Sequence, residues 1–373
     1  MPFQVINSQP QLIAVIEQCS AAPVRYLDTE FVRERSLYPQ FGLLQISDGN
    51  QVWLVDPLGI DDLSPLWQWL QQTDQLTVFH AFGEDLELLW HEGKIQFGNI
   101  LDTQVAAAML DWGSGMGFAA LVERVCGVEL DKSHSRTNWL ARPLSEQQLQ
   151  YAADDVHYLV PVAEALITEL KAKGLYEACM NECSRLAARK DKSLANRYLD
   201  VKNTWQLNRQ QLAVLRELAA WRYQRAMAKD MALGFVIKDL ALIALARSQP
   251  ESMAKLKQLN DVSPIEARIH GSKLLSLIAD AKKIDKADWP EQIYRVIDIP
   301  QYKQRSKALA QLIQQQAEQA DIPAPALASK RLINELLMWH WQQPKNDDKP
   351  VLLSGWRGQL VGETLTQWLA TNC

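Results

Sequence analysis

Cysteine and histidine are scarce in this chain, and neither occurs at the spacing of a zinc site. The five cysteines among 373 residues form no Cys-x-x-Cys pair, and the six histidines include no two spaced four apart. Cys179 and Cys183 lie one helical turn apart without a second pair to complete a site. We interpret the cysteines as reduced packing residues. Any bound metal must then have oxygen ligands, which favours Mg²⁺ or Mn²⁺.

Long apolar runs are also missing. No run can span a bilayer, and the first residues, Met1-Pro2-Phe3-Gln4-Val5, lack the basic start and apolar core of a signal peptide. We therefore expect a cytoplasmic protein without a membrane partner. The net charge of −5 argues weakly against a nucleic-acid partner, but it does not exclude one, because local charge matters more than the sum.

The hydrophobic fraction of 47% and the charged fraction of 22% are typical of a globular protein, and the length predicts two or three domains. The first half alternates strand and helix signals. Turn residues near Tyr38-Pro39 and at Asp48-Gly49-Asn50 predict an antiparallel meander of three strands, and helical patterns between the later strands imply parallel crossovers. The predicted strands are 24–31, 41–47, 51–56, 76–80 and 99–102. The fold class is therefore α/β, with a mixed sheet flanked by helices.

The second half predicts helices only. Ser145 followed by Gln148 reads as a capping box that opens a long helix, with a disturbance at Pro161 and an end at Lys173-Gly174. Beyond residue 200 the strand signals vanish, and residues 209–283 predict four or five short helices. A second helical module of similar length follows. The predicted domains are 1–203, 204–289 and 290–373.

The strand that contains Val24 to Phe31 carries two acids, Asp28 and Glu30. Side chains alternate along a strand, so both point to the same face. Two neighbouring carboxylates repel each other unless a cation shares the site. A pair of Mg²⁺-like ions would resolve this conflict, and two-metal sites cleave phosphodiesters in many nucleases.

Two further acids stand where they could join this pair. Asp85 falls on the first turns of the helix after the strand that ends near His80, and this edge of a sheet is where α/β folds bind ligands. Tyr151 and Asp155 are four residues apart and share a helix face, whereas Asp154 is turned about 100° away. Each of these residues taken alone would more often be a surface or packing residue.

Together, Asp28-x-Glu30, Asp85 and Tyr151-x-x-x-Asp155 resemble the three motifs of the DEDD exonuclease superfamily, tyrosine subtype. The stretch from Leu130 to Leu144 and the wider chain resemble bacterial ribonuclease D, and residues 209–283 resemble an HRDC module. The resemblance implies a ribonuclease-H-like exonuclease domain followed by two all-α HRDC-like domains. It also implies a monomer that hydrolyses RNA from a free 3′ end to nucleoside 5′-monophosphates, with precursors of tRNA and other small structured RNAs as substrates.

By the same resemblance, Asp28, Glu30, Asp85 and Asp155 would hold two divalent ions, with Mg²⁺ preferred over Mn²⁺, and Tyr151 would orient the attacking water. Basic and aromatic residues before the Tyr151 helix suggest a contact with the RNA backbone and bases, because phosphate contacts and base stacking are what a single-strand reader needs. These candidates are Lys132, Arg136, Trp139 and Arg142. Plain packing is an equal alternative for this stretch.

Two other functions remain open at the level of sequence. The same carboxylates would serve a 3′–5′ exonuclease that acts mainly on DNA, and no residue identifies a partner for the 2′-hydroxyl. A catalytically idle binding scaffold would require one motif position to be missing, and all five are present. The glycine-rich run from Asp111 to Gly117 lacks the Lys-Ser/Thr of a Walker loop, so we expect no nucleotide cofactor.

Overall fold

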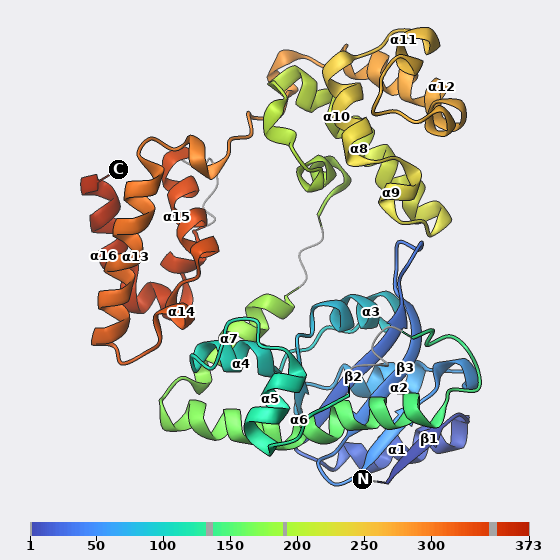
Figure 1. Ribbon diagram of the computed structural model, residues 1–373, viewed down its shortest axis with the longest axis vertical. Coiled ribbons are helices and arrows are strands. Elements are labelled where there is room, and N and C mark those ends of the chain that lie inside the picture. Colours follow the sequence, from blue (N-terminus) through green and yellow to red (C-terminus); the bar gives the residue numbers. More distant parts are fainter. Residues whose placement is uncertain (1, 132–136, 189–191, 343–348, 373) are drawn as a thin grey trace. The chain divides into compact units, whose positions relative to one another are not determined.

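The computed structural model describes residues 2–131, 137–188, 192–342 and 349–372 (Figure 1). The chain divides into two compact units. The first contains residues 1–32, 40–189 and 299–373, and the second contains residues 33–39 and 190–298. The domain boundaries at 203/204 and 289/290 stay predictions.

The first unit is built on a six-stranded mixed sheet with the order β1-β4-β3-β2-β5-β6. The predicted meander is present, since β3 pairs antiparallel with both β2 and β4. The other three pairings are parallel. The short edge strand β1 was not predicted. The strands are β1 (Phe3–Ile6), β2 (Val24–Val32), β3 (Gln40–Ser47), β4 (Val52–Val55), β5 (Leu76–Phe79) and β6 (Ile100–Asp102).

A long helix, α6 (Glu146–Ala172), crosses the sheet and contacts β2, β3 and β4 (Figure 1). Its first turn is fixed by the predicted capping box. The Ser145 hydroxyl accepts from the Gln148 N–H at 3.2 Å, and the Gln148 side chain accepts from the Ser145 N–H at 3.0 Å. The predicted disturbance at Pro161 does not interrupt the helix. Buried Leu159 and Val162 anchor it on both sides of the proline.

Strand alternation divides the apolar side chains between the two faces of the sheet. Leu43 and Leu54 pack with Val156 of α6 in one cluster. Leu44 and Leu12 belong to the larger core of the unit. The helices that complete this part are α1 (Gln9–Ser20), α2 (Ser64–Leu70), α3 (Gly83–Gly93), α4 (Thr103–Met109), α5 (Phe118–Cys126) and α7 (Tyr176–Ala187).

The C-terminal helices belong to this same unit. Ala326 is part of its larger core, and Arg357 forms a buried ion pair with Glu182 of α7 at 2.5 Å. Arg357 also donates to the carbonyls of Leu327 at 2.8 Å and Ala326 at 3.0 Å. These helices are α13 (Tyr302–Gln319), α14 (Ala324–Leu327), α15 (Lys330–Gln342) and α16 (Gly355–Asn372).

The second unit is helical, as predicted, and has its own apolar core. It includes residues 33–39, which follow β2. Leu37 lies in this core, and Asp230 accepts from the backbone N–H groups of Leu37 and Tyr38 at 3.1 and 3.2 Å. The helices are α8 (Arg209–Lys229), α9 (Leu233–Val236), α10 (Asp239–Ser248), α11 (Met253–Lys257) and α12 (Pro264–Ala281). Among the helices described in either unit, none has the length and apolarity needed to cross a membrane.

Candidate active site

Three of the predicted acids meet between β2 and α6. One carboxylate oxygen of each of Asp28, Glu30 and Asp155 lies within 4.8 Å of the other two. Strand alternation explains the first two, and α6 brings Asp155 to the same face of the sheet. A register shift in the pairing of β2 with β3 follows Glu30 directly. Such irregularities often lie beside active sites, because they re-aim the strand.

Asp85 lies beside this group, but it is not one of the three residues whose carboxylate oxygens lie within 4.8 Å of one another. It is buried in the first turn of α3, and its Oδ1 accepts a hydrogen bond from the Thr29 hydroxyl. After burial, which is the main cause, its charge also raises the pKa of both Asp28 and Glu30, so Asp85 belongs to the same electrostatic cluster. The four predicted carboxylates are therefore neighbours, although Asp85 approaches from a different element.

The turn that leads into α3 is held by Asp102, at the end of β6. Its carboxylate accepts from the backbone N–H groups of Ala81 at 2.9 Å and Phe82 at 3.1 Å. The same carboxylate caps α4 through the Gln104 N–H at 2.8 Å. Ala81 has a left-handed φ of 57°, which is unfavourable for alanine. Asp102 therefore stabilises the strained turn from which Asp85 projects.

Tyr151 precedes Asp155 by one turn of α6, and its hydroxyl donates to the Asp155 carboxylate. Its ring packs against Trp139 with centroids 6.2 Å apart. Burial, and then the charges of the nearby carboxylates, raise the pKa of the Tyr151 phenol above its ordinary value of 10. The phenol therefore stays protonated at neutral pH and can orient a water rather than remove its proton.

The acids of the cluster disfavour one another's ionisation. Burial, followed by the neighbouring carboxylates, raises the pKa of Glu30 to about 9 and that of Asp155 to about 8. Burial is also the main reason why the pKa of Asp85 rises to about 6 and that of Asp28 rises well above 3.8. A divalent cation would remove this penalty. The oxygen-only donor set fits Mg²⁺ or Mn²⁺.

One of the four predicted RNA-contacting residues, Trp139, is buried. Trp139 is only 1% exposed and packs in the cluster beneath α6, so its indole is not available to stack on a nucleobase. A Cβ on Gly42 would lie 2.8 Å from the Trp139 Cβ, which shows how closely β3 approaches this ring. Trp139 therefore has a packing role. Lys132 and Arg136 lie outside the described residues.

Arg142 also has structural partners. Its guanidinium donates to both carboxylate oxygens of Asp56, at 2.6 and 2.7 Å, and to the Gly42 carbonyl at 2.7 Å. Such a bidentate pair orders the stretch before α6. A direct role in RNA binding would require these contacts to break.

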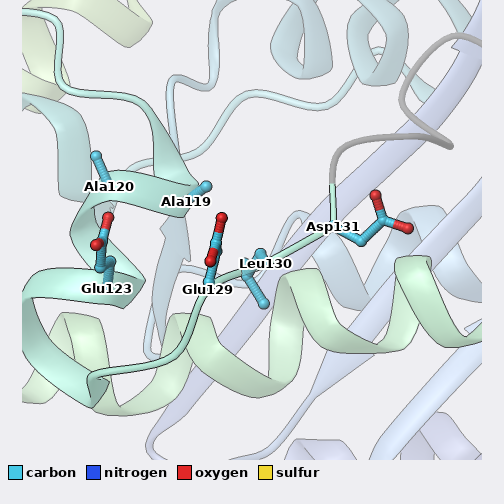
Figure 2. A pocket seen from close by; sticks show the side chains of 6 residues that line it. All are labelled: Ala119, Ala120, Glu123, Glu129, Leu130 and Asp131. Carbon is cyan, nitrogen blue, oxygen red and sulfur yellow. The ribbon is translucent and has the colours of Figure 1, made fainter.

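A pocket that the sequence did not indicate lies beside α5 (Figure 2). It has a volume of about 560 Å³ and is lined by Ala119, Ala120, Glu123, Glu129, Leu130 and Asp131. In Figure 2 the Asp131 side chain points away from the side on which Glu123 and Glu129 lie. The pocket's lining contains three acids but none of the residues of the candidate active site.

Sequence reasoning missed three polar residues around the carboxylates, namely Thr29, Gln45 and Asp102. Thr29 and Asp102 make the contacts given above, and Gln45 is fully buried beside Asp28 in the strand pairing. The sequence did offer a signal for these residues: each is a polar residue in an otherwise apolar strand, and a polar side chain that is buried needs a hydrogen-bond partner.

Comparison with protein families finds a known domain in each of three parts of the chain. Residues 3–171 match the family of 3′-5′ exonucleases, residues 211–278 match the HRDC domain, and residues 300–365 match the C-terminal HRDC domain of ribonuclease D. These matches fall inside the three predicted domains. A sheet that carries this acidic cluster, followed by two HRDC domains, defines the class of the chain as a 3′–5′ exonuclease.

Whole-length relatives narrow this class. The chain is 43% identical over 372 residues to ribonuclease D of Musicola paradisiaca, covering 99% of both chains, and 41% identical over 371 residues to that of Escherichia coli, covering 98% of both. The crystal structure of E. coli RNase D, described as an exoribonuclease involved in structured RNA processing, matches with a TM-score of 0.93 and 40% identity over the full length of both chains. A protein from Bifidobacterium adolescentis, 21% identical with a TM-score of 0.70, shares the fold over 99% of this chain and 97% of its own.

The chain belongs to the ribonuclease D family, and it is a 3′–5′ exoribonuclease. The predicted family, fold class and enzyme class are thereby confirmed. The two alternatives left open by the sequence, an exonuclease mainly for DNA and an idle scaffold, are not favoured by these relatives.

Proposed function

We propose that Asp28, Glu30, Asp85 and Asp155 hold two divalent cations at the 3′-terminal phosphodiester of an RNA, with Mg²⁺ as the natural ion and Mn²⁺ as a substitute. The observation that supports this most directly is the approach of three carboxylate oxygens to within 4.8 Å of one another. When bound, the cations would lower the pKa of the attacking water and offset the charge on the leaving 3′-oxygen.

The residues of the chain have distinct tasks in this scheme. The four carboxylates fix the position of the scissile phosphate by holding its counter-ions. The protonated Tyr151 hydroxyl, directed by its hydrogen bond to Asp155, orients the attacking water in line with the bond to be cleaved. Thr29 holds the Asp85 carboxylate, and Asp102 holds the turn before it.

The substrate that we propose is RNA with a free 3′ end, in particular precursors of tRNA and other small structured RNAs, hydrolysed one nucleotide at a time by a monomer. Membership of the ribonuclease D family supports an RNA substrate. The description of the E. coli relative as an enzyme of structured RNA processing supports the substrate class.

The test uses a tRNA precursor with a 3′ extension and a 5′ label, incubated with and without Mg²⁺, with products resolved nucleotide by nucleotide. We expect stepwise trimming only with the cation, and slower turnover of a DNA strand of the same sequence. The trimming proposal fails if the structured precursor is trimmed no faster than an unstructured RNA with the same 3′ end.

Isosteric variants test the assignment of residues. Asp28→Asn and Asp155→Asn keep the side-chain shape but remove a negative charge, so both should lose nearly all activity while remaining folded. Asp154→Asn is the matched control, because Asp154 lies next to Asp155 but hydrogen-bonds to Gln150 at 2.8 Å. Degradation of the RNA by Asp155→Asn at the wild-type rate would refute the two-cation assignment.

A further inference from the structure

Gln45 of β3 is a buried polar residue without a partner. Its side chain is 0% exposed, and neither its amide nitrogen nor its amide oxygen has a hydrogen-bond partner among the described residues. Leaving such a group unsatisfied destabilises the folded state. A buried polar group of this kind requires an explanation, and a role at a functional site is one of the few available.

The strand pairing shows which functional group is within reach. Gln45 stands directly opposite Asp28 of β2 on one side and Leu54 of β4 on the other. Residues opposite each other in an antiparallel pair share a face, with Cβ atoms about 4.5–5.5 Å apart. The Gln45 side chain therefore lies on the Asp28 face of the sheet, between the carboxylate cluster and an apolar neighbour.

Packing alone does not account for a glutamine at this position. Leu43 and Leu54 lie on the same face and are both buried in the cluster beneath α6. A methionine or leucine in place of Gln45 would fill a similar volume without a desolvated amide. Asp28 is the polar residue that the register places against it, and a carboxylate has about four positions that can accept hydrogen bonds.

We propose that Gln45 is a positioning residue for Asp28: its amide N–H₂ donates to the Asp28 carboxylate in the cation-loaded enzyme and fixes the orientation in which that carboxylate holds the ions. This inference rests on the two-cation function proposed above. Groups that orient metal ligands in this way typically contribute 10–100-fold to metal affinity or activity.

The test compares Gln45→Met with Leu54→Met. Gln45→Met removes the amide and keeps the length of the side chain. Leu54→Met makes a volume-conserving change at the same depth on the adjoining strand, away from the acids. Three quantities are measured on the full chain: the melting temperature without cations, the affinity for Mn²⁺ by calorimetry, and kcat and KM on a short RNA.

Gln45→Met should melt no lower than Leu54→Met without cations, because it removes an unsatisfied amide. Its Mn²⁺ affinity should fall about tenfold or more, and kcat should fall with it while KM for RNA changes little. Leu54→Met should retain the wild-type affinity and rate.

Two results would overturn the inference. A wild-type affinity and rate in Gln45→Met would show that the amide does not act on Asp28. A lower cation-free melting temperature than that of Leu54→Met would show that the amide serves the fold instead. If the wild-type protein binds no more Mn²⁺ than Asp28→Asn does, the two-cation proposal itself fails, and this inference fails with it.

Discussion

The carboxylate cluster should make the cation-free protein less stable as the pH rises. Most acids in folded proteins have the opposite effect, because their pKa values are lowered by folding. Burial and mutual repulsion raise the pKa of Glu30 to about 9, of Asp155 to about 8 and of Asp85 to about 6. In the unfolded chain these groups return to ordinary values near 4. Between about pH 4 and pH 9 the folded state therefore binds more protons than the unfolded state, and stability falls as pH rises.

The size of this effect follows from the shifts. For Asp85, which is 7% exposed, a change from 3.8 to about 6 corresponds to about 3 kcal/mol. The four groups titrate as a coupled set, so their contributions do not add. For the whole cluster we expect a loss of about a few kcal/mol between pH 5 and pH 9. At about 2–4 °C per kcal/mol, the unit that carries the cluster should melt about 10 °C lower at pH 9.

The assay is thermal unfolding in a chelator at several pH values, repeated with excess Mg²⁺ or Mn²⁺. The cations should stabilise the protein most at high pH and remove most of the fall, because binding replaces the protons. Glu30→Gln should flatten the pH dependence without cations, since one titrating group is gone. A cation-free melting temperature that rises from pH 5 to pH 9, or one that cations leave unchanged throughout, would refute the reasoning.

Three further changes test other parts of the account. Asp102→Ala should lower kcat on RNA at least tenfold with little change in KM. Adding Ala81→Gly should restore part of the rate, because glycine adopts the left-handed conformation of this turn without strain. If the second substitution restores no activity, Asp102 does not act by holding this turn. Arg357→Met should lower the free energy of unfolding in urea by about 2 kcal/mol: Glu182 keeps its pair with Arg185 at 2.7 Å, but the buried carbonyls of Ala326 and Leu327 lose their donor. A loss below about 1 kcal/mol would contradict this. Tyr151→Phe should lose most of kcat while calorimetry shows unchanged Mn²⁺ affinity; an equal loss of affinity would make the phenol part of the cation site.

Local periodicity was sufficient for much of the site. The two-residue repeat of a strand places Asp28 beside Glu30, and the helical repeat places Tyr151 on the same face as Asp155. The position of Asp85 followed from the rule that ligands bind at the carboxyl ends of strands. These relations depend on neighbours in sequence or on a general property of sheets, so they need no knowledge of tertiary packing.

Long-range contacts decided the features that sequence reasoning did not reach. Arg142 reaches Asp56 and Gly42, which are 86 and 100 residues away, and no local pattern distinguishes such an arginine from one that binds phosphate. Leu37 follows β2 in sequence but packs into the core of the second unit. Gln45 could have been singled out as a polar residue in an apolar strand, but its pairing with Asp28 depends on the strand register.

The central claim is that four carboxylates from β2, α3 and α6 share two divalent cations. Anomalous diffraction from crystals soaked in Mn²⁺ tests it most directly. We predict two peaks, about 4 Å apart as in other two-metal sites, bounded by Asp28, Glu30, Asp85 and Asp155, with both weakened in Asp28→Asn. Well-diffracting crystals at saturating Mn²⁺ without a peak at these four residues would contradict the account.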